Sequence, residues 1–273
     1  MVDLAASAEV ARTPCGEGDL VWRSWGSGTP LVLLHGGSGS WMHWLRNIPA
    51  LSRGYRVLAP DMPGLGESAM PPGEGSPGEV APPLRDGLVR LLGERRRYHL
   101  CGFSFGANVG GHLAALEGAH VLSLTLVGAA SLGLPRPPLD LLRVRDREGE
   151  ARRAAHRENL ARLMFHDAGL IDETALEIQE HNTRHARLRS RGYAPGDGLK
   201  RALVKVAAPL GGIWGECDSV AMPDVRARLD VLRAIDPGLL EEVIPGAGHW
   251  VAYEAPEAFN AALLRFLAAR AAS

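Results

Sequence analysis

The segment from Gly102 to Gly106, GFSFG, places a serine between two glycines at the end of an apolar run. A serine at the centre of a G-x-S-x-G turn can act as a nucleophile, because the sharp passage from strand to helix exposes its hydroxyl group. The glycines suit such a turn, since neighbouring backbone passes close to positions without a side chain. The competing interpretation makes Ser104 an ordinary helix N-cap, a position that serine favours.

A nucleophilic serine needs a base that accepts its proton and an acid that orients the base. Among the ten histidines, His249 follows the last strand-like run and precedes a C-terminal helix-like segment. Asp218 follows the strand-like run at 209–215. Both positions fall at the carboxyl edge of a parallel sheet, where α/β sites are built. We therefore predict Ser104, Asp218 and His249 as the catalytic residues.

Neighbouring residues leave alternatives for two of these roles. Glu216 and Asp224 are alternative acids, because the sequence does not set the conformation of the loop that holds them. The alternative bases are His35, His43 and His112. His35 ends a strand-like run and is expected to bond backbone, whereas His112 is expected to pack inside a helix interface.

Hydrolysis at a carbonyl also requires hydrogen-bond donors for the oxyanion that develops. The backbone N–H of Phe105, directly after the serine, is one predicted donor. The loop HGGSGS after the run at 30–35 exposes bare backbone, and we predict Gly37 as the second donor. The same loop lacks G-x-G-x-x-G and Gly-Lys-Ser/Thr, which disfavours a nucleotide site.

The elements that must position these residues alternate along the chain. Short apolar runs are followed by Gly- or Pro-containing loops and helix-like segments, a pattern typical of βα units on a parallel sheet. The predicted strands cover residues 20–25, 30–35, 55–60, 98–103, 121–128, 209–215 and 239–246. The predicted helices cover residues 41–52, 80–96, 105–117, 223–235 and 256–271. The sequence thus predicts an α/β fold.

This alternation stops once, between residues 133 and 200. The segment has no strand-like run and carries Arg, Glu, His and Leu at helical spacing. We predict that residues 133–200 form an inserted helical cap, and that residues 1–132 and 201–273 form one α/β core.

The composition of the chain limits the kinds of partner and the cellular location that we expect for the protein. The 273 residues are 46% hydrophobic, enough to bury a large core, and 30 basic against 31 acidic residues leave a net charge of -1. We therefore expect a small-molecule substrate, and neither nucleic acid nor membrane as partner. The N-terminus does not resemble a secretory signal, so we expect the mature chain to begin there. Three widely spaced cysteines fit a reducing compartment and predict a cytoplasmic protein.

His181 and His185 stand four positions apart, a spacing that zinc can use on a helix. The glutamate of H-E-x-x-H is missing between them, so we predict a solvated helix face and no metal site. Arginines in the same region are interleaved with acidic residues, which indicates a charged outer face and not a nucleic-acid surface.

The chain resembles the α/β-hydrolase superfamily over nearly its whole length. The matching segments are HGGSGSWMHW (35–44), APDMPGLGES (59–68), GFSFG (102–106), IWGECD (213–218) and GAGHWVAYEAPEAFN (246–260). Within the superfamily it is similar to the branch of meta-cleavage-product C–C hydrolases and small carboxylesterases. The resemblance implies a mostly parallel eight-stranded sheet flanked by helices, a helical cap over the active site, no cofactor and hydrolysis at a carbonyl.

Some features of the chain favour the C–C hydrolases of that branch and others favour its carboxylesterases. Trp250 directly after the base, and a cap in which Arg184 would hold a substrate carboxylate, match the C–C hydrolases. Phe103 stands where those hydrolases typically have Asn, and HGGSGS lacks their Gly-Pro. We therefore predict hydrolysis of a carboxylic ester, with C–C hydrolysis and a non-catalytic ligand-binding role as alternatives. Epoxide hydrolases and haloalkane dehalogenases need a carboxylate where this chain has Ser104.

Aromatic residues near the motifs are expected to line an apolar acyl pocket, with core packing as the competing interpretation. They are Trp41, Trp44, Phe103, Phe105 and Trp250. The predicted substrate-binding residues are Ser38, Trp41, Phe103, Arg184 and Trp250.

Overall fold

A computed structural model describes residues 2–271 of the chain. Eight strands form one sheet in the order β1-β2-β4-β3-β5-β6-β7-β8. The strands are β1 (Glu9–Cys15), β2 (Gly18–Trp25), β3 (Pro30–Leu34), β4 (Arg56–Pro60), β5 (Tyr98–Phe103), β6 (Val121–Val127), β7 (Leu210–Gly215) and β8 (Leu240–Ile244). β2 pairs antiparallel with β1 and β4, and the pairs from β4 to β8 are parallel. The predicted mostly parallel eight-stranded sheet is confirmed.

Strand β1 has no counterpart among the strands predicted from apolar runs. Its sequence, EVARTPC, contains charged residues and Pro14, and most of its side chains are at least partly exposed. It pairs with β2 alone, at the edge of the sheet, where a proline is tolerated because one side of the strand needs no ladder partner. Apolar runs identify strands that are covered on both faces, so an edge strand of this kind gives little signal.

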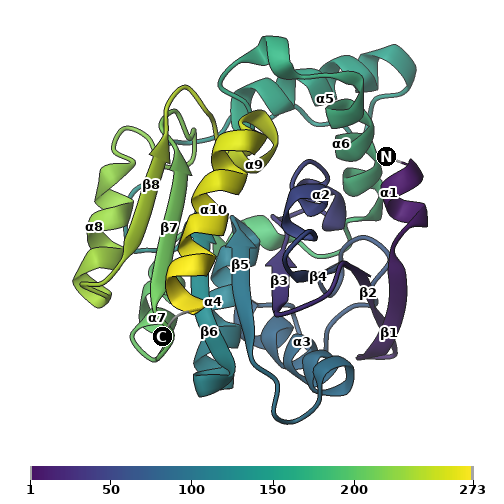
Figure 1. Ribbon diagram of the computed structural model, residues 1–273. Coiled ribbons are helices and arrows are strands. Elements are labelled where there is room, and N and C mark those ends of the chain that lie inside the picture. Colours follow the sequence, from purple (N-terminus) through teal and green to yellow (C-terminus); the bar gives the residue numbers. More distant parts are fainter. Residues whose placement is uncertain (1, 272–273) are drawn as a thin grey trace.

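Helices cover both faces of the sheet (Figure 1). They are α1 (Val2–Ala6), α2 (Ile48–Leu51), α3 (Pro77–Leu92), α4 (Phe105–Glu117), α5 (Gly149–Leu163), α6 (Glu173–His185), α7 (Gly198–Leu203), α8 (Arg226–Ile235), α9 (Val251–Glu254) and α10 (Pro256–Ala271), with 3-10 turns η1 (Trp41–Trp44), η2 (Gly118–His120), η3 (Ala168–Leu170) and η4 (Ser190–Tyr193). The predicted helix at 41–52 is therefore two short pieces, η1 and α2. No helix in the described part of the chain is both long and apolar enough to span a membrane.

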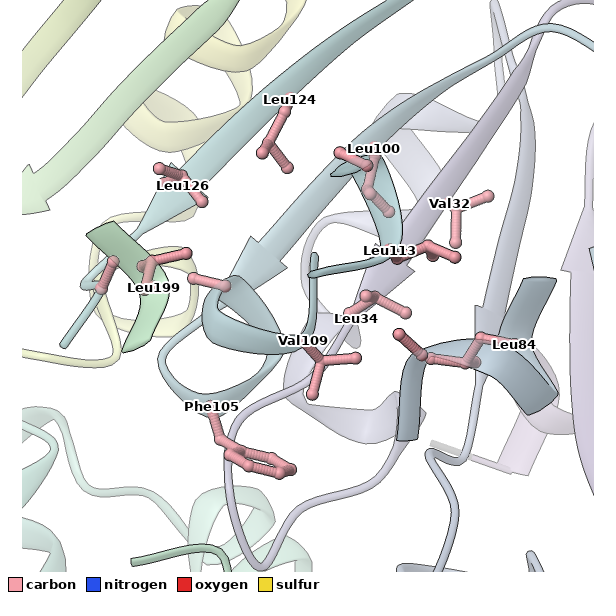
Figure 2. Packing of buried hydrophobic residues seen from close by; sticks show 14 of the residues in the cluster. Val32, Leu34, Leu84, Leu100, Phe105, Val109, Leu113, Leu124, Leu126 and Leu199 are labelled. Atoms are coloured by element: carbon pink, nitrogen blue, oxygen red, sulfur yellow. The ribbon is translucent and has the colours of Figure 1, made fainter. Parts of the chain in front are cut away.

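The hydrophobic core has two parts, one on each face of the sheet. In β3, Val32 and Leu34 belong to the cluster beneath α3 and α4, whereas Leu31 and Leu33 belong to the cluster beneath α10. Successive residues of a strand point to opposite faces, which explains why β3 is apolar throughout. Figure 2 shows Val32 and Leu34 packed with leucines and valines of the neighbouring strands and helices. This core holds β3 and β5 rigidly, and the motif loops follow both strands.

The stretch between β6 and α7, residues 128–197, interrupts the alternation of strands and helices. We call it the inserted segment. It contains α5 and α6, which pack together beyond one end of the sheet (Figure 1). Residues 198–200, which the predicted cap included, begin α7, and α7 packs against α4.

Candidate active site

Ser104 lies at the turn between β5 and α4, in a backbone conformation that L-residues rarely adopt. Its φ is 52° and its ψ is -112°. The turn is held by hydrogen bonds from Ser104 N to Val127 O (2.8 Å) and from Ala107 N to Ser104 O (3.0 Å). The side chain makes no capping hydrogen bond to α4, so its hydroxyl is free for another role. Backbone strain of this kind is typical of functional sites.

Two glycines make this turn possible. A Cβ on Gly102 would lie 2.3 Å from Gly106 O, and a Cβ on Gly106 would lie 2.3 Å from Leu34 O and 2.4 Å from His35 O. Backbone atoms cannot move aside as the end of a side chain can. The tight turn from β5 into α4 therefore requires glycine at position 102, and the close approach of α4 to the end of β3 requires glycine at position 106.

We expect Gly106→Ala to lower the free energy of unfolding by about 3 kcal/mol, because the new methyl group overpacks rigid backbone. Gly110→Ala, on the same helix, is the matched control. A Cβ there meets only side-chain atoms, at 3.4 Å or more, and alanine favours a helix interior. Urea unfolding of both variants measures the difference, and equal stability of Gly106→Ala and wild type would contradict the steric explanation.

A hydrogen-bonded chain of three side chains begins at the Ser104 hydroxyl. Ser104 Oγ lies 3.0 Å from Nε2 of His249, and Nδ1 of His249 lies 2.9 Å from both carboxylate oxygens of Asp218. Asp218 is fully buried and His249 is 3% exposed. The carboxylate accepts a hydrogen bond from Nδ1–H, which keeps the imidazole proton on Nδ1 and leaves Nε2 able to accept the Ser104 proton. Asp218 is held in turn by Val220 N, which donates to Oδ1 at 2.8 Å.

The alternative acids and bases lie elsewhere. Glu216 is exposed and its Oε2 accepts from Gly246 N at 3.1 Å. Asp224 accepts from the backbone at the start of α8. His35 accepts at Nε2 from Met62 N, at 2.8 Å, which is the backbone role expected for it. His112 lies partly buried on α4.

The glycine-rich loop after β3 lies beside the turn at Ser104. We call residues 36–38 the oxyanion loop. Gly37 and Phe105 line the same cavity as Ser104, and a Cβ on Gly37 would lie 3.5 Å from the Cβ of Phe105. The structure therefore brings both predicted oxyanion donors next to the candidate nucleophile.

His43 is hydrogen-bonded to the first residue of this loop. It is 3% exposed, and its Nδ1 accepts a hydrogen bond from Gly36 N at 3.1 Å. Burial lowers the pKa of His43 well below its usual range, and nearby His35 and His249 lower it further. His43 therefore stays neutral, as an acceptor at Nδ1 must. His249, not His43, is the histidine within hydrogen-bond distance of Ser104.

A cavity of about 210 Å³ opens beside Ser104 and His249. The core contributes Ser38 and Phe103 to its wall. The inserted segment contributes a mixture of apolar and polar side chains, including Leu139, Leu163, Met164, Gln179, Thr183 and Tyr193. A mostly apolar cavity with a few convergent polar groups is the usual form of a small-molecule site.

A family model described as the alpha/beta hydrolase family matches residues 31–262. The chain belongs to this family. It is 30% identical to 2-hydroxy-6-oxononadienedioate/2-hydroxy-6-oxononatrienedioate hydrolase 2 of Pseudomonas putida, over 96% of this chain and 97% of that protein. It is 33% identical to the dihydrolipoyllysine-residue acetyltransferase component of the acetoin cleaving system of Pseudomonas putida, over 88% of this chain and 64% of that protein. This chain therefore spans less than two thirds of that second relative.

The fold of this hydrolase is shared with naproxen esterase (carboxylesterase NP) from Bacillus subtilis. The TM-score is 0.76 at 22% identity, and the match covers 95% of this chain and 91% of that one. The suspected membership of the α/β-hydrolase branch with esterases and meta-cleavage-product hydrolases is confirmed.

Three predicted substrate-binding residues of the hydrolase do not line the cavity. Trp41 is buried against Trp25, with ring centroids 5.3 Å apart. Trp250 is buried and its indole N–H donates to His43 O at 2.9 Å. Arg184 is exposed and pairs with Glu180 at 2.5 Å. The prediction is wrong for these three because tertiary packing turns their side chains away from the cavity, whereas Ser38 and Phe103 do line it.

The cavity also has residues that the sequence did not single out. Arg136 lines it from an irregular stretch of the inserted segment, and Arg191 lines it from η4. Both are exposed overall, and neither forms an ion pair with a carboxylate in the part of the chain that the structure describes. The only available signal was positive charge within the predicted cap, which did not distinguish them from its other arginines.

His181 and His185 stack on the outside of α6, with ring centroids 4.1 Å apart. Nδ1 of His185 donates to His181 O at 2.7 Å, so it is used within the helix. Within residues 2–271, no group of three or more His, Cys, Asp or Glu side chains is arranged to hold a metal ion.

Proposed function

We propose that this enzyme is a serine hydrolase that cleaves a small carboxylic ester through an acyl-enzyme on Ser104. The observation that carries the proposal is the buried chain from Ser104 Oγ through His249 to Asp218, with hydrogen bonds of 3.0 and 2.9 Å, at the wall of a cavity. This arrangement supplies the nucleophile, the base and the group that orients the base.

In the proposed first step, Ser104 Oγ bonds to the substrate carbonyl carbon and its proton passes to Nε2 of His249. The carbonyl electron pair moves to oxygen, which accepts hydrogen bonds from the backbone N–H groups of Gly37 and Phe105. When the intermediate collapses, His249 returns the proton to the departing alcohol. Water then attacks the acyl-enzyme by the same route, and the acid leaves. Asp218 stabilises the positively charged imidazole of His249 during both formation and hydrolysis of the acyl-enzyme.

We further propose that residues 133–200 act as a cap over this site. The support is that the inserted segment supplies many of the residues that line the cavity beside Ser104. At about 210 Å³ the cavity suits a small substrate, since pockets for drug-sized ligands measure about 300–1,000 Å³. The free Cys15, Cys101 and Cys217 support a reducing, cytoplasmic setting as part of the same proposal.

C–C hydrolysis of a meta-cleavage product is the second candidate. It is favoured by the relative of 30% identity whose name states such an activity, and by the unpaired Arg136 and Arg191 at the cavity, which would attract a carboxylate. Phe103 argues against it, because an apolar ring beside Ser104 offers no hydrogen bond to a dienoate oxygen. We therefore rank ester hydrolysis first.

A panel of p-nitrophenyl acyl esters and one ring-fission dienoate, followed by absorbance, tests the ranking. We expect turnover of short acyl esters and labelling of Ser104 by a fluorophosphonate. Rapid consumption of the dienoate with negligible ester turnover would reverse the order of the two candidates. Absence of both turnover and labelling would support the non-catalytic ligand-binding role.

A further inference from the structure

Ser190 is a buried hydroxyl at the cavity to which the proposed mechanism assigns no role. It begins η4 in the inserted segment, is 4% exposed, and lines the cavity together with Ser104. A serine on a surface turn normally faces water, so its burial here calls for a physical explanation.

The backbone around Ser190 is fixed to the core on both sides. Before it, Leu188 N donates to Gly64 O at 3.0 Å. After it, Tyr193 O accepts from Nδ2 of Asn108, on α4, at 3.1 Å. These bonds tie the turn to the loop after β4 and to the helix that follows the nucleophile. The backbone that carries Ser190 is therefore held against the core before substrate binds.

That hydroxyl lies directly against the oxyanion loop. A Cβ built on Gly37 would lie 2.2 Å from Ser190 Oγ and 3.5 Å from the Cβ of Phe105. The oxygen of Ser190 thus occupies the space that a side chain at Gly37 would need. It lies next to Gly37, and the space on that side of Gly37 is bounded by Phe105, the residue of the second proposed oxyanion donor.

Within residues 2–271, Ser190 Oγ has no hydrogen-bond partner. Because Ser190 lines the cavity, the proton of its hydroxyl group is available to a molecule bound there. Thr183 provides the contrast. It lines the same cavity, but its Oγ1 already donates to Gln179 O at 2.9 Å.

We propose that Ser190 donates a third hydrogen bond to the oxyanion, beside the N–H groups of Gly37 and Phe105. This inference rests on the proposed serine-hydrolase function. As the bond from Ser104 Oγ to the carbonyl carbon forms, negative charge grows on the carbonyl oxygen and the Ser190 hydrogen bond strengthens. Ser190 keeps its own proton throughout, while the proton of Ser104 passes to His249. The inserted segment then contributes to the chemistry as well as to the cavity wall.

The test compares Ser190→Ala with wild type by ester turnover and by binding of a short alkylboronic acid, which forms a tetrahedral adduct on the nucleophilic serine. We expect kcat to fall roughly 10- to 100-fold with little change in KM, because the lost bond is made chiefly in the transition state. Boronic acid affinity should weaken by a similar factor. The unfolding midpoint of the variant checks that it is folded.

Ser40→Ala is the matched control. Ser40 Oγ donates to Asn182 Oδ1 at 2.7 Å and so joins the same loop region to α6, but it does not line the cavity. We expect its kcat to stay within about twofold of wild type, because no transition-state contact is lost. An equal loss in Ser40→Ala would assign the effect to packing and overturn the proposal.

If Ser190→Ala has the same kcat and the same boronic acid affinity as the wild type, the proposed role of Ser190 is overturned and the proposed function is left intact. A wild-type protein that neither turns over esters nor binds the boronic acid would overturn both. If wild type binds the boronic acid without ester turnover, the comparison of affinities decides the role of Ser190 by itself.

Discussion

Ser104→Ala is expected to lower kcat for a p-nitrophenyl ester by about 10⁵-fold or more. The substitution removes the attacking oxygen but leaves the bond between His249 and Asp218 in place, so the remaining site can only activate water poorly. Steady-state absorbance assays of purified protein measure the loss. Labelling by a fluorophosphonate, followed by intact-protein mass spectrometry, should disappear together with turnover.

A second serine with a positive φ controls for the effect of alanine at such a position. Ser131 has a φ of 62° and lies outside the main cavity. Ser131→Ala should therefore retain wild-type turnover and labelling. Full turnover by Ser104→Ala would show that Ser104 is not the nucleophile, whatever the behaviour of the control.

Asp218→Asn is expected to lower kcat by about 10⁴-fold. Val220 N donates to Oδ1 of Asp218 at 2.8 Å, so the amide oxygen of asparagine should remain on that side. Its NH₂ group would then replace Oδ2, one of the two oxygens that lie 2.9 Å from Nδ1 of His249, and the negative charge that favours a proton on Nδ1 would be lost. The imidazole proton would move to Nε2, which could no longer accept the proton of Ser104.

Glu216→Gln is the matched control for the acid. Glu216 lies two residues away, is exposed, and contacts the backbone at Gly246 instead of His249. Its kcat should stay within about twofold of wild type, since the triad geometry is untouched. A severe loss in Glu216→Gln beside an active Asp218→Asn would transfer the orienting role to Glu216. Both variants are read out in the same ester assay.

The turn at Ser104 could be predicted from a few neighbouring residues because its requirements are local. A strand must end, the chain must reverse sharply, and backbone must pass within contact distance of Gly102 and Gly106. These demands act within about one turn of chain, so GFSFG indicates the geometry directly. The parallel strands could also be predicted from sequence, since a run such as 31–34 is buried on both faces and is therefore apolar throughout. Positions at the carboxyl ends of such strands meet at one edge, which is how His249 and Asp218 could be chosen.

The wall of the cavity was decided by tertiary structure alone. Thr183 and Arg184 are adjacent on α6, yet Thr183 lines the cavity and Arg184 faces solvent. Periodicity limits which residues share a helix face, but only the packing of α6 decides which face meets the core. Ser190 and Arg191 both lie in η4, which is too short to show a periodic pattern. Their places depend on hydrogen bonds to residues distant in sequence, such as that between Tyr193 and Asn108.

The sequence by itself determined the candidate nucleophile, base and acid, because strand ends and a glycine turn place them. The surroundings of the substrate were set only when the inserted segment packed against the core, because contacts between distant parts of the chain leave no local pattern.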